Sequence, residues 1–452
     1  MNILMASTPA TGHLNPMLAI ARILIEEGHA VTLLTGTRLR DRVERAGARF
    51  RPLPGKADFD PADVFTRAPE LKTLPPGPQW HRLAFERLFA DSIAPQFDGI
   101  QDSLLDSPAD VIVADSMFFG VLPMLLGPRA KRPPVVLCGT SFLHWRRPDD
   151  APHFAGLPPA RNAAERDEHA ALAREFDRLV DRPIAAHLNP ILRELGVGPL
   201  ETPILESVVA LSDAFIQLTI PGFEYPRDFF PPSVHFVGTP PIIPGQAPLP
   251  PWAHELDGSR QIVLITQGTV ANHNLGLLIA PALAALASEP DVLVVVTTGG
   301  RPIEAIPGPI PPNARLASYL PFEWLLPQVD AFVTNGGYGS VNQALSFGIP
   351  LVTAGLTEDK ASVNARVAWS GVGIDLATNE PTADALRVAI RSVLDQPRYR
   401  QRAAAMADEY AEIDTRSEIL GIIGDVVVDE QTAIVVQRTG IPLAGRGRRA
   451  IL

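Results

Sequence analysis

Two residues that directly follow apolar runs have side chains suited to acid–base chemistry. His13 lies a few residues after the apolar run 3–6, and Asp115 ends the apolar run 111–114. An imidazole is well tuned for general-base work near neutral pH. A carboxylate bonded to it would fix its tautomer and stabilise its protonated form. Alone, His13 could be structural and Asp115 could cap a helix; together they are candidates for a catalytic dyad.

A glycine-rich turn in the second half of the chain indicates a site of another kind. The apolar run 331–334 leads into Asn335-Gly336-Gly337-Tyr338-Gly339-Ser340, and a helix is expected to begin near Ser340. Glycines let the backbone approach a ligand, and the first amides of a helix bind anions. No Gly-Lys-Ser/Thr follows, so the turn is not a Walker A loop. We interpret it as a cradle for a diphosphate.

Short apolar runs alternate with helical patterns in both halves of the chain. The expected strands of the first half are 3–6, 31–35, 49–53, 111–114 and 135–138, and a helix is expected to open at Pro16. Those of the second half are 262–266, 292–297, 315–318, 331–334, 351–354 and 373–376. This alternation is typical of βαβ units and parallel sheets. Ligands of such sheets bind at the carboxyl ends of the strands, where His13 and Asp115 are expected.

The pattern predicts an α/β protein with two doubly wound, Rossmann-like domains that face each other across a cleft. The first domain is expected over 1–237, a proline-rich linker over 238–257, the second domain over 258–424 and a solvated tail over 425–452. Two long irregular insertions, about 54–107 and 141–202, interrupt the first domain. Insertions at strand ends of α/β sheets commonly build binding pockets.

Composition restricts the class of protein. The net charge of −11 argues against nucleic acid or an anionic membrane surface as a main partner. Cys138, the only cysteine, lies in an apolar run and is expected to be a buried, inert thiol. No apolar run has the roughly 18 residues of a membrane span, and no targeting segment opens the chain, so a cytoplasmic location is expected. Few lysines and many arginines and prolines suggest a GC-rich bacterium.

The motifs resemble those of the UDP-glycosyltransferase superfamily of GT-B enzymes, especially bacterial natural-product glycosyltransferases. Gly12-His13-Leu14-Asn15-Pro16 resembles the family's Gly-His-x-x-Pro, whose histidine is the catalytic base. Val113-Ala114-Asp115 resembles the segment that carries its aspartate partner. Gln267-Gly268-Thr269 and the motifs at 325–327, 336–340, 344–345, 348–350 and 364–365 resemble the donor signature in order and spacing.

The resemblance implies an inverting transferase that moves a hexose from a UDP- or dTDP-sugar, such as UDP-glucose, to a hydroxyl of a small apolar acceptor. A polyketide, a macrolide or a phenolic natural product would be such an acceptor, held by the first domain. No metal and no cofactor beyond the nucleotide sugar are implied. His13 and Asp115 would be catalytic. The implied donor site comprises Gly12, Gly268, Thr269, Tyr319, Leu320, Asn335, Gly336, Gly337, Gly339, Ser340, Asp359 and Lys360.

Three positions depart from the family pattern. Asn335 replaces a histidine and could donate to a phosphate oxygen without carrying charge. Asp359-Lys360 replaces an acid–glutamine pair: Asp359 could accept from sugar hydroxyls, whereas Lys360 could face a charged sugar or pair with Glu358 or Asp359. We favour the pairing. Phe322 replaces a glutamine near the nucleobase, where Tyr319 could stack on a pyrimidine.

Two other functions are compatible with the same fold. A non-catalytic, sugar-nucleotide-binding helper protein is favoured by Asn335 and Lys360 but opposed by His13 with Asp115. A nucleotide-sugar epimerase would need no acceptor pocket, so the two insertions oppose it. The pair Asp58 and Asp60 resembles a metal-binding Asp-x-Asp, but it lies in a loop of the first domain, and metal dependence is not expected. The oligomeric state is left open.

Overall fold

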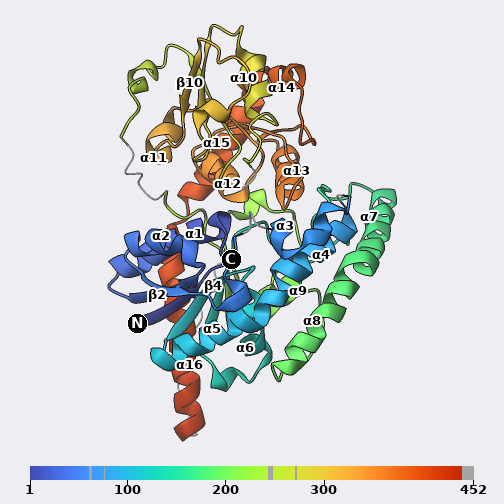
Figure 1. The fold of residues 1–452 in the computed structure, drawn as a ribbon, viewed down its shortest axis with the longest axis vertical. Helices are drawn as coiled ribbons and strands as arrows, with labels where there is room; N and C mark the ends of the chain where they lie inside the picture. Colours follow the sequence, from blue (N-terminus) through green and yellow to red (C-terminus); the bar gives the residue numbers. More distant parts are fainter. Residues whose placement is uncertain (61–63, 76, 243–247, 270–271, 440–452) are drawn as a thin grey trace.

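The computed structural model describes residues 1–439 apart from 61–63, 76, 243–247 and 270–271. The described chain forms two parallel sheets with helices packed around each, one in each half of the molecule (Figure 1). The five strands predicted in the first half and the six predicted in the second are all present, with ends that differ by at most one residue. Residues 243–247 of the predicted linker and 440–452 of the predicted tail lie outside the described residues.

The first sheet has the order β3-β2-β1-β4-β5-β6-β7. Its strands are β1 (Asn2–Ala6), β2 (Ala30–Thr35), β3 (Arg49–Pro52), β4 (Val111–Asp115), β5 (Val135–Gly139), β6 (Ala214–Gln217) and β7 (Val234–Phe236). The order reverses direction between β1 and β4, which pair in parallel. Strands β6 and β7 were not predicted, because runs of four and three residues give no readable period.

The second sheet has the order β10-β9-β8-β11-β12-β13. Its strands are β8 (Gln261–Thr266), β9 (Val292–Thr297), β10 (Ala314–Ala317), β11 (Ala331–Thr334), β12 (Leu351–Thr353) and β13 (Gly373–Asp375). Here the reversal falls between β8 and β11, whose last residues Thr266 and Thr334 are paired. Each sheet therefore has a switch point, where open α/β sheets bind ligands.

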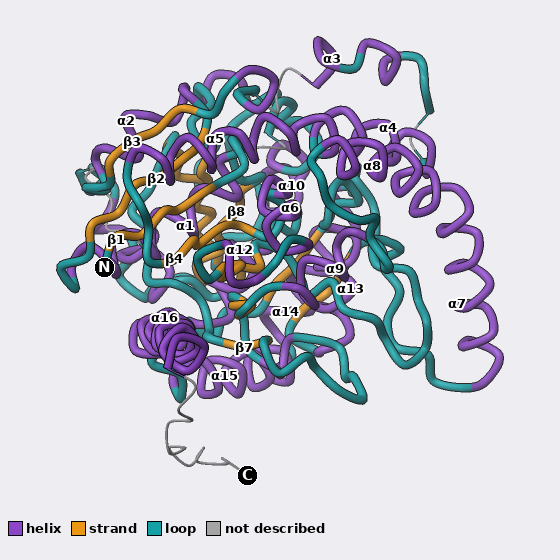
Figure 2. The backbone as a smooth tube through the Cα atoms, turned by 90° about the horizontal axis from the view of Figure 1, so that it is seen from below, coloured by secondary structure: helices purple, strands orange, loops and turns teal. Residues whose placement is uncertain are grey.

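Helices connect the strands and cover the sheets. Those of the first half are α1 (Thr11–Glu26), α2 (Arg40–Arg45), α3 (Val64–Arg67), α4 (Pro78–Leu88), α5 (Ile93–Asp106), α6 (Leu122–Leu126), α7 (Ala163–Phe176), α8 (Arg182–Glu194) and α9 (Ile204–Leu211). Those of the second half are α10 (Ile279–Leu286), α11 (Phe322–Leu325), α12 (Tyr338–Ser346), α13 (Lys360–Ser370), α14 (Ala383–Asp395), α15 (Pro397–Ala411) and α16 (Thr415–Thr439). The predicted insertions form α3–α5 and α7–α8, and α7 and α8 run along one edge of the molecule (Figure 2).

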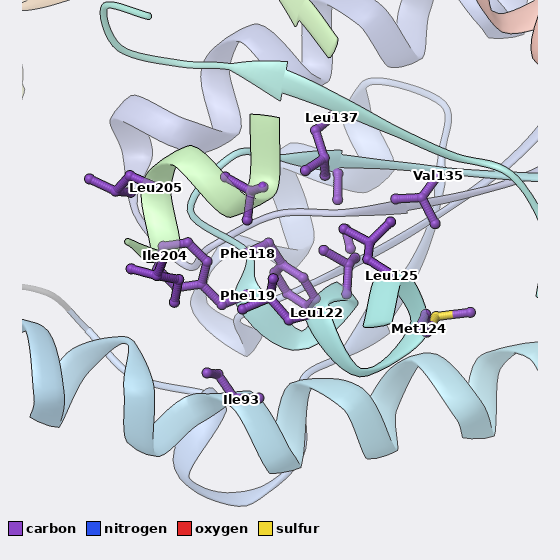
Figure 3. Packing of buried hydrophobic residues seen from close by; sticks show 14 of the residues in the cluster. Ile93, Phe118, Phe119, Leu122, Met124, Leu125, Val135, Leu137, Ile204 and Leu205 are labelled. Carbon is purple, nitrogen blue, oxygen red and sulfur yellow. The ribbon is translucent and has the colours of Figure 1, made fainter. Parts of the chain in front are cut away.

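Both faces of the first sheet are buried. Leu4 and Ala6 of β1 belong to one apolar cluster, whereas Ile3 and Met5 belong to another. Because neighbouring side chains of a strand point to opposite faces, the two clusters lie on opposite sides of the sheet. In the first cluster, side chains of α5, α6 and α9 pack on β5 (Figure 3).

The second sheet has an apolar cluster that also contains residues of the first domain. Phe142, Ile220 and Phe223 lie in one buried cluster with Leu264 of β8 and Phe332 of β11. This shared cluster joins the two domains directly, beside the loops that follow β5 and β6. Their relative position is therefore stabilised by buried apolar surface.

Residues 425–439 of the predicted solvated tail belong to helix α16, and Val427 among them is buried against the first domain, contrary to the prediction. Helix α16 runs from the second domain back along the first (Figure 1), where Ile419, Ile422, Ile423 and Val427 join the cluster of β1 and α1. Arg416 forms ion pairs with Glu26 and Glu27 at the end of α1. The sequence offers no reliable boundary here, because Gly421 and Gly424, residues of a type that usually marks a helix end, lie inside the helix.

Candidate active site

His13 and Asp115 lie at the switch point of the first sheet. Ala6 at the end of β1 pairs with Ala114, so Asp115 emerges at the edge of the sheet where the chain leaves β1. Helix α1 begins at Thr11, not at Pro16 as predicted, and His13 therefore lies in its first turn rather than in a loop. Pro16 lies inside α1, where its missing N–H leaves the carbonyl of Gly12 without the usual partner.

The two predicted catalytic side chains are in direct contact. Nδ1 of His13 lies 3.1 Å from Oδ1 of Asp115 and 2.9 Å from Oγ1 of Thr140. Because an ionised carboxylate only accepts hydrogen bonds, we assign the ring proton to Nδ1. Nε2 is then the basic nitrogen, on a residue that lines the central cavity. This is the arrangement required of a general base and its orienting acid.

Asp115 is held rigidly behind the imidazole. Its side chain is fully buried and accepts hydrogen bonds from the backbone N–H groups of Thr8, at 2.6 Å, and Met117, at 2.9 Å. Burial lowers the pKa of His13, but the charge and hydrogen bond of Asp115, with a contribution from Asp359, outweigh burial and raise that pKa above its ordinary value. The site therefore stabilises the imidazolium that proton abstraction would create.

The glycine-rich turn lies at the switch point of the second sheet, opposite the dyad. Gly336, with φ of 94°, has no room for a side chain, since a Cβ there would lie 1.8 Å from Oδ1 of Asn364. By contrast, a Cβ at Gly337 or Gly339 would meet no atom within 4 Å. Helix α12 begins at Tyr338, two residues before the predicted start. Its first turn, with Ser340, lines the cavity and can bind an anion through backbone amides.

Asn335 makes a contact within the protein that the sequence did not predict. Its side-chain nitrogen donates to the backbone carbonyl of Gln267, at 2.7 Å, and so ties the turn after β11 to the turn after β8. The latter turn carries Gly268, with φ of 70°, and Thr269, both of which line the cavity. Asn335 therefore positions the two turns against each other, in addition to lining the cavity itself.

The segment expected to bind the sugar approaches the dyad from the second domain. Asp359 precedes α13 and accepts a hydrogen bond from Oγ of Ser141, at 2.5 Å, across the domain boundary. Lys360 is buried and forms an ion pair with Glu358, which agrees with the favoured pairing. Glu358 has a φ of 52°, a strained value for a residue with a side chain and one found more often at functional sites.

Tyr319 and Leu320 line the cavity beyond the diphosphate turn. The Tyr319 side chain is 62% exposed, and its ring lies against Gly300, where a Cβ would be 2.3 Å from the hydroxyl. An exposed aromatic face at a cavity wall can stack on a planar base. Stacking of Tyr319 on a pyrimidine stays a prediction.

One cavity of about 1900 Å³ connects these elements. It is lined by each predicted site residue except Asp115 and Gly336, which support His13 and the glycine-rich turn from behind. On the side of the first domain, the two insertions supply an aromatic wall. Prominent members of that wall are Phe59, Trp80, Phe85, Phe89, Phe154 and Phe176. This part of the cavity suits a large apolar molecule.

The residues considered for metal or thiol chemistry, Asp58, Asp60 and Cys138, do not line this cavity. Within the described part of the chain, no group of three or more His, Cys, Asp and Glu side chains is arranged to hold a metal ion. Asp58 accepts from the backbone N–H of Thr37, and Asp60 pairs with Arg38. Cys138 is fully buried in β5, and burial raises the pKa of its thiol. No helix among the described residues is long and apolar enough to span a membrane.

Sequence motifs did not identify three residues that complete the site. Thr8 donates to Asp115, Thr140 contacts His13, and Ser141 contacts Asp359. Thr140 and Ser141 directly follow β5, at the same sheet edge as the dyad. Two hydroxyl residues just after the predicted strand 135–138, at the strand end where ligands bind, were the sequence signal for Thr140 and Ser141.

Comparison with known proteins identifies the family. Residues 3–93 match the glycosyltransferase family 28 N-terminal domain, and 282–426 match the erythromycin biosynthesis protein CIII-like C-terminal domain. The chain is 40% identical to 4'-demethylrebeccamycin synthase of Lentzea aerocolonigenes, over 94% of this chain and 99% of that protein. It is 36% identical to UDP-glycosyltransferase 2 of Phaeomoniella chlamydospora, over 94% and 95%. The chain thus belongs to the nucleotide-sugar glycosyltransferases and is an enzyme, as the motifs implied.

Solved structures support the GT-B fold. The glycosyltransferase of kitacinnamycin aligns with a TM-score of 0.69 at 21% identity, covering 95% of this chain and 98% of that one. The glycosyltransferase VinC, solved in complex with dTDP, aligns with a TM-score of 0.66 at 20% identity, covering 95% and 100%. At such low identity, these two similarities concern the fold alone.

Proposed function

We propose that this enzyme transfers a hexose, with inversion, from a nucleoside diphosphate sugar to a hydroxyl of an apolar natural product. The observation that carries the proposal is the placement of the His13–Asp115 dyad and the glycine-rich turn on one cavity between the domains. A base on one side and an anion cradle on the other are what a displacement at the anomeric carbon requires.

In the proposed mechanism, Nε2 of His13 accepts the proton of the acceptor hydroxyl. The acceptor oxygen forms a bond to the anomeric carbon as the bond from that carbon to the diphosphate oxygen breaks. Attack from the face opposite the departing diphosphate inverts the configuration. Asp115 keeps the proton of Nδ1 in place and balances the charge of the imidazolium, as its contact and its effect on the pKa of His13 support.

The diphosphate leaves toward the amides of the first turn of α12. Gly337 and Gly339 keep this surface open, and Ser340 adds a hydroxyl on the cavity side. Fixed backbone dipoles stabilise the developing negative charge of the diphosphate, and they do not have to reorient during the reaction. These groups belong to the protein, so the step needs no added cation to balance charge.

For the donor we propose UDP-glucose or a dTDP-sugar with a neutral hexose. Asp359 is placed to accept from sugar hydroxyls, and the charge of Lys360 is already balanced by Glu358. Among the relatives, one is named a UDP-glycosyltransferase, whereas VinC was solved with dTDP. For the acceptor, the aromatic wall favours an apolar compound such as a phenolic, a polyketide or a macrolide, and the relationship to 4'-demethylrebeccamycin synthase supports a natural product.

A donor and acceptor panel tests the proposal. UDP-glucose, UDP-glucuronic acid and dTDP-glucose are each incubated with phenolic, polycyclic aromatic and macrolide-aglycone acceptors, and products are detected by mass spectrometry. We expect a product with one added hexose, and His13→Ala should lower turnover by roughly 10²–10⁴. Its affinity for UDP, measured by calorimetry, should stay unchanged. Wild-type turnover in His13→Ala would contradict the mechanism.

A further inference from the structure

Helix α13, which begins directly after Asp359, is buried on two sides. Eight of its eleven residues are buried, including Lys360 and Arg366. Val363 and Val367 pack into the apolar cluster of the second sheet. Arg366 belongs to the side of the helix that contacts the first domain, and it is only 2% exposed. The helix that carries the sugar-binding segment is therefore also part of the interface between the domains.

A buried ion pair fixes this helix to the first domain. Nε and Nη2 of Arg366 lie 3.2 and 3.0 Å from Oε2 of Glu224. The guanidinium also lies over the rings of Phe142, at 4.3 Å, and Tyr225, at 4.2 Å. A fully buried ion pair whose guanidinium also stacks on two rings has one well-defined geometry. It therefore fixes the position of α13 relative to the first domain.

The second oxygen of Glu224 holds the loop that supports the general base. Oε1 accepts from the backbone N–H of Leu143, at 2.7 Å. Three residues earlier, Thr140 contacts Nδ1 of His13, and the intervening Ser141 contacts Asp359. One carboxylate thus joins the loop behind His13 to the helix behind Asp359. Arg227, 3.4 Å from Oε2, completes its surroundings.

We propose that Glu224 is a positioning residue that sets the separation between the general base and the donor-sugar segment. The contacts form a closed ring from Ser141 through Leu143, Glu224, Arg366 and α13 to Asp359 and back to Ser141. The neighbouring Thr140 joins His13 to this ring. The inference rests on the proposed function, because it assumes that His13 and Asp359 act on one reaction. Alignment matters there: misplacement of reacting groups by about 1 Å lowers rates by about 10².

Glu224→Gln tests whether both contacts of the Glu224 carboxylate, to Leu143 and to Arg366, are needed at once. A glutamine has nearly the same shape, but one of its two terminal groups is a donor. If its oxygen accepts from Leu143, its NH₂ faces the guanidinium of Arg366; if it faces Arg366 with its oxygen, the N–H of Leu143 loses its acceptor. The variant can therefore keep one half of the connection but not both.

The experiment compares two fates of the same donor, using the donor and acceptor pair with the highest wild-type turnover in the panel. Transfer places the sugar on the acceptor, and hydrolysis places it on water. In Glu224→Gln we expect transfer to fall by about 10- to 100-fold, with a smaller fall in hydrolysis. UDP affinity should remain within about twofold, because the glycine-rich turn is not in the ring. The ratio of transfer to hydrolysis therefore falls.

Two further variants separate positioning from stability. Glu409→Gln makes the same chemical change at another contact between the domains, where Gly222 donates to Glu409 at 2.8 Å, and should leave the ratio unchanged. Glu224→Gln combined with Arg366→Met removes the guanidinium that the single variant leaves unpaired, while Arg227 keeps its hydrogen bonds to the carbonyls of Leu143 and Tyr225. This double variant should not restore the ratio. An unchanged ratio in folded Glu224→Gln overturns this inference alone. No turnover by the wild type with any pair refutes the proposed function instead.

Discussion

At the scale of single residues, the contacts of one imidazole nitrogen decide the chemistry of the site. Asp115 and Thr140 both meet Nδ1 of His13, so Nε2 is the nitrogen left for the substrate. The raised pKa of His13 then has a defined consequence for activity. The neutral imidazole is the active form, so activity should rise with pH through a midpoint above 6.5, the ordinary value.

Replacing the carboxylate should move that midpoint in the opposite direction. In Asp115→Asn, burial still lowers the pKa of His13, but the opposing charge is gone, so the acidic limb of the kcat/KM profile should shift to lower pH. The plateau should fall by roughly 10²–10⁴, because the tautomer and the imidazolium lose support. Asp110→Asn, at the other end of β4, should change neither. A limb that stays in place in Asp115→Asn would show that another group titrates.

The pairing of Lys360 with Glu358 leads to a second prediction at this scale. Lys360→Gln should weaken UDP-glucose and UDP-glucuronic acid alike, by at most about fivefold, since one net hydrogen bond is worth about 1 kcal/mol. The affinity for each nucleotide sugar is measured as its inhibition constant in an assay with the preferred donor. Selective loss of UDP-glucuronic acid would instead assign Lys360 to the recognition of sugar charge.

At the scale of elements, glycines of one turn have separate roles. Gly336→Ala forces a Cβ onto Asn364 at a positive φ, so it should lower the melting temperature. A Cβ at Gly339 would meet no protein atom within 4 Å, so Gly339→Val should fold normally, yet its side chain would face the cavity and should abolish UDP binding. Ser340→Ala should weaken UDP by about 1 kcal/mol. Calorimetry and thermal unfolding check the three variants, and unchanged UDP affinity in both Gly339→Val and Ser340→Ala would place the nucleotide elsewhere.

The sequence predicted elements best where composition and period agree. Long apolar strands such as β8 and β9 were predicted almost to the residue. The start of α1 was not, because Pro16 suggested a first helical position although it lies inside the helix. Motifs pointed to residues that the structure brings together, such as His13 and Gly339 on one cavity. Contacts that depend on three-dimensional folding, such as Glu224 with Arg366, leave no local signal in sequence.

At the scale of the whole molecule, helix α16 contributes to the stability of the first domain from the far end of the chain. Ile423 is fully buried in the cluster beneath β1 and α1, so Ile423→Ala should lower the free energy of unfolding by about 2–5 kcal/mol. Val428, 58% exposed on the same helix, provides the control. Val428→Ala should change the free energy of unfolding by at most about 0.5 kcal/mol. Urea unfolding measures both. Equal effects would mean that α16 does not stabilise the domain.

The return of α16 determines how this enzyme can be recombined with its relatives. Thr415, at the start of α16, donates to the carbonyl of Thr239, so the chain passes between the domains twice at neighbouring points. A hybrid joined once, after residue 238, would carry a foreign last helix and set it against the native α1 and β6. Two junctions, near 238 and 414, would exchange the donor-binding part as an inserted cassette and keep α16 on its own partners, so that, among the apolar clusters, only the shared one around Phe142, Ile220 and Phe223 would meet foreign residues.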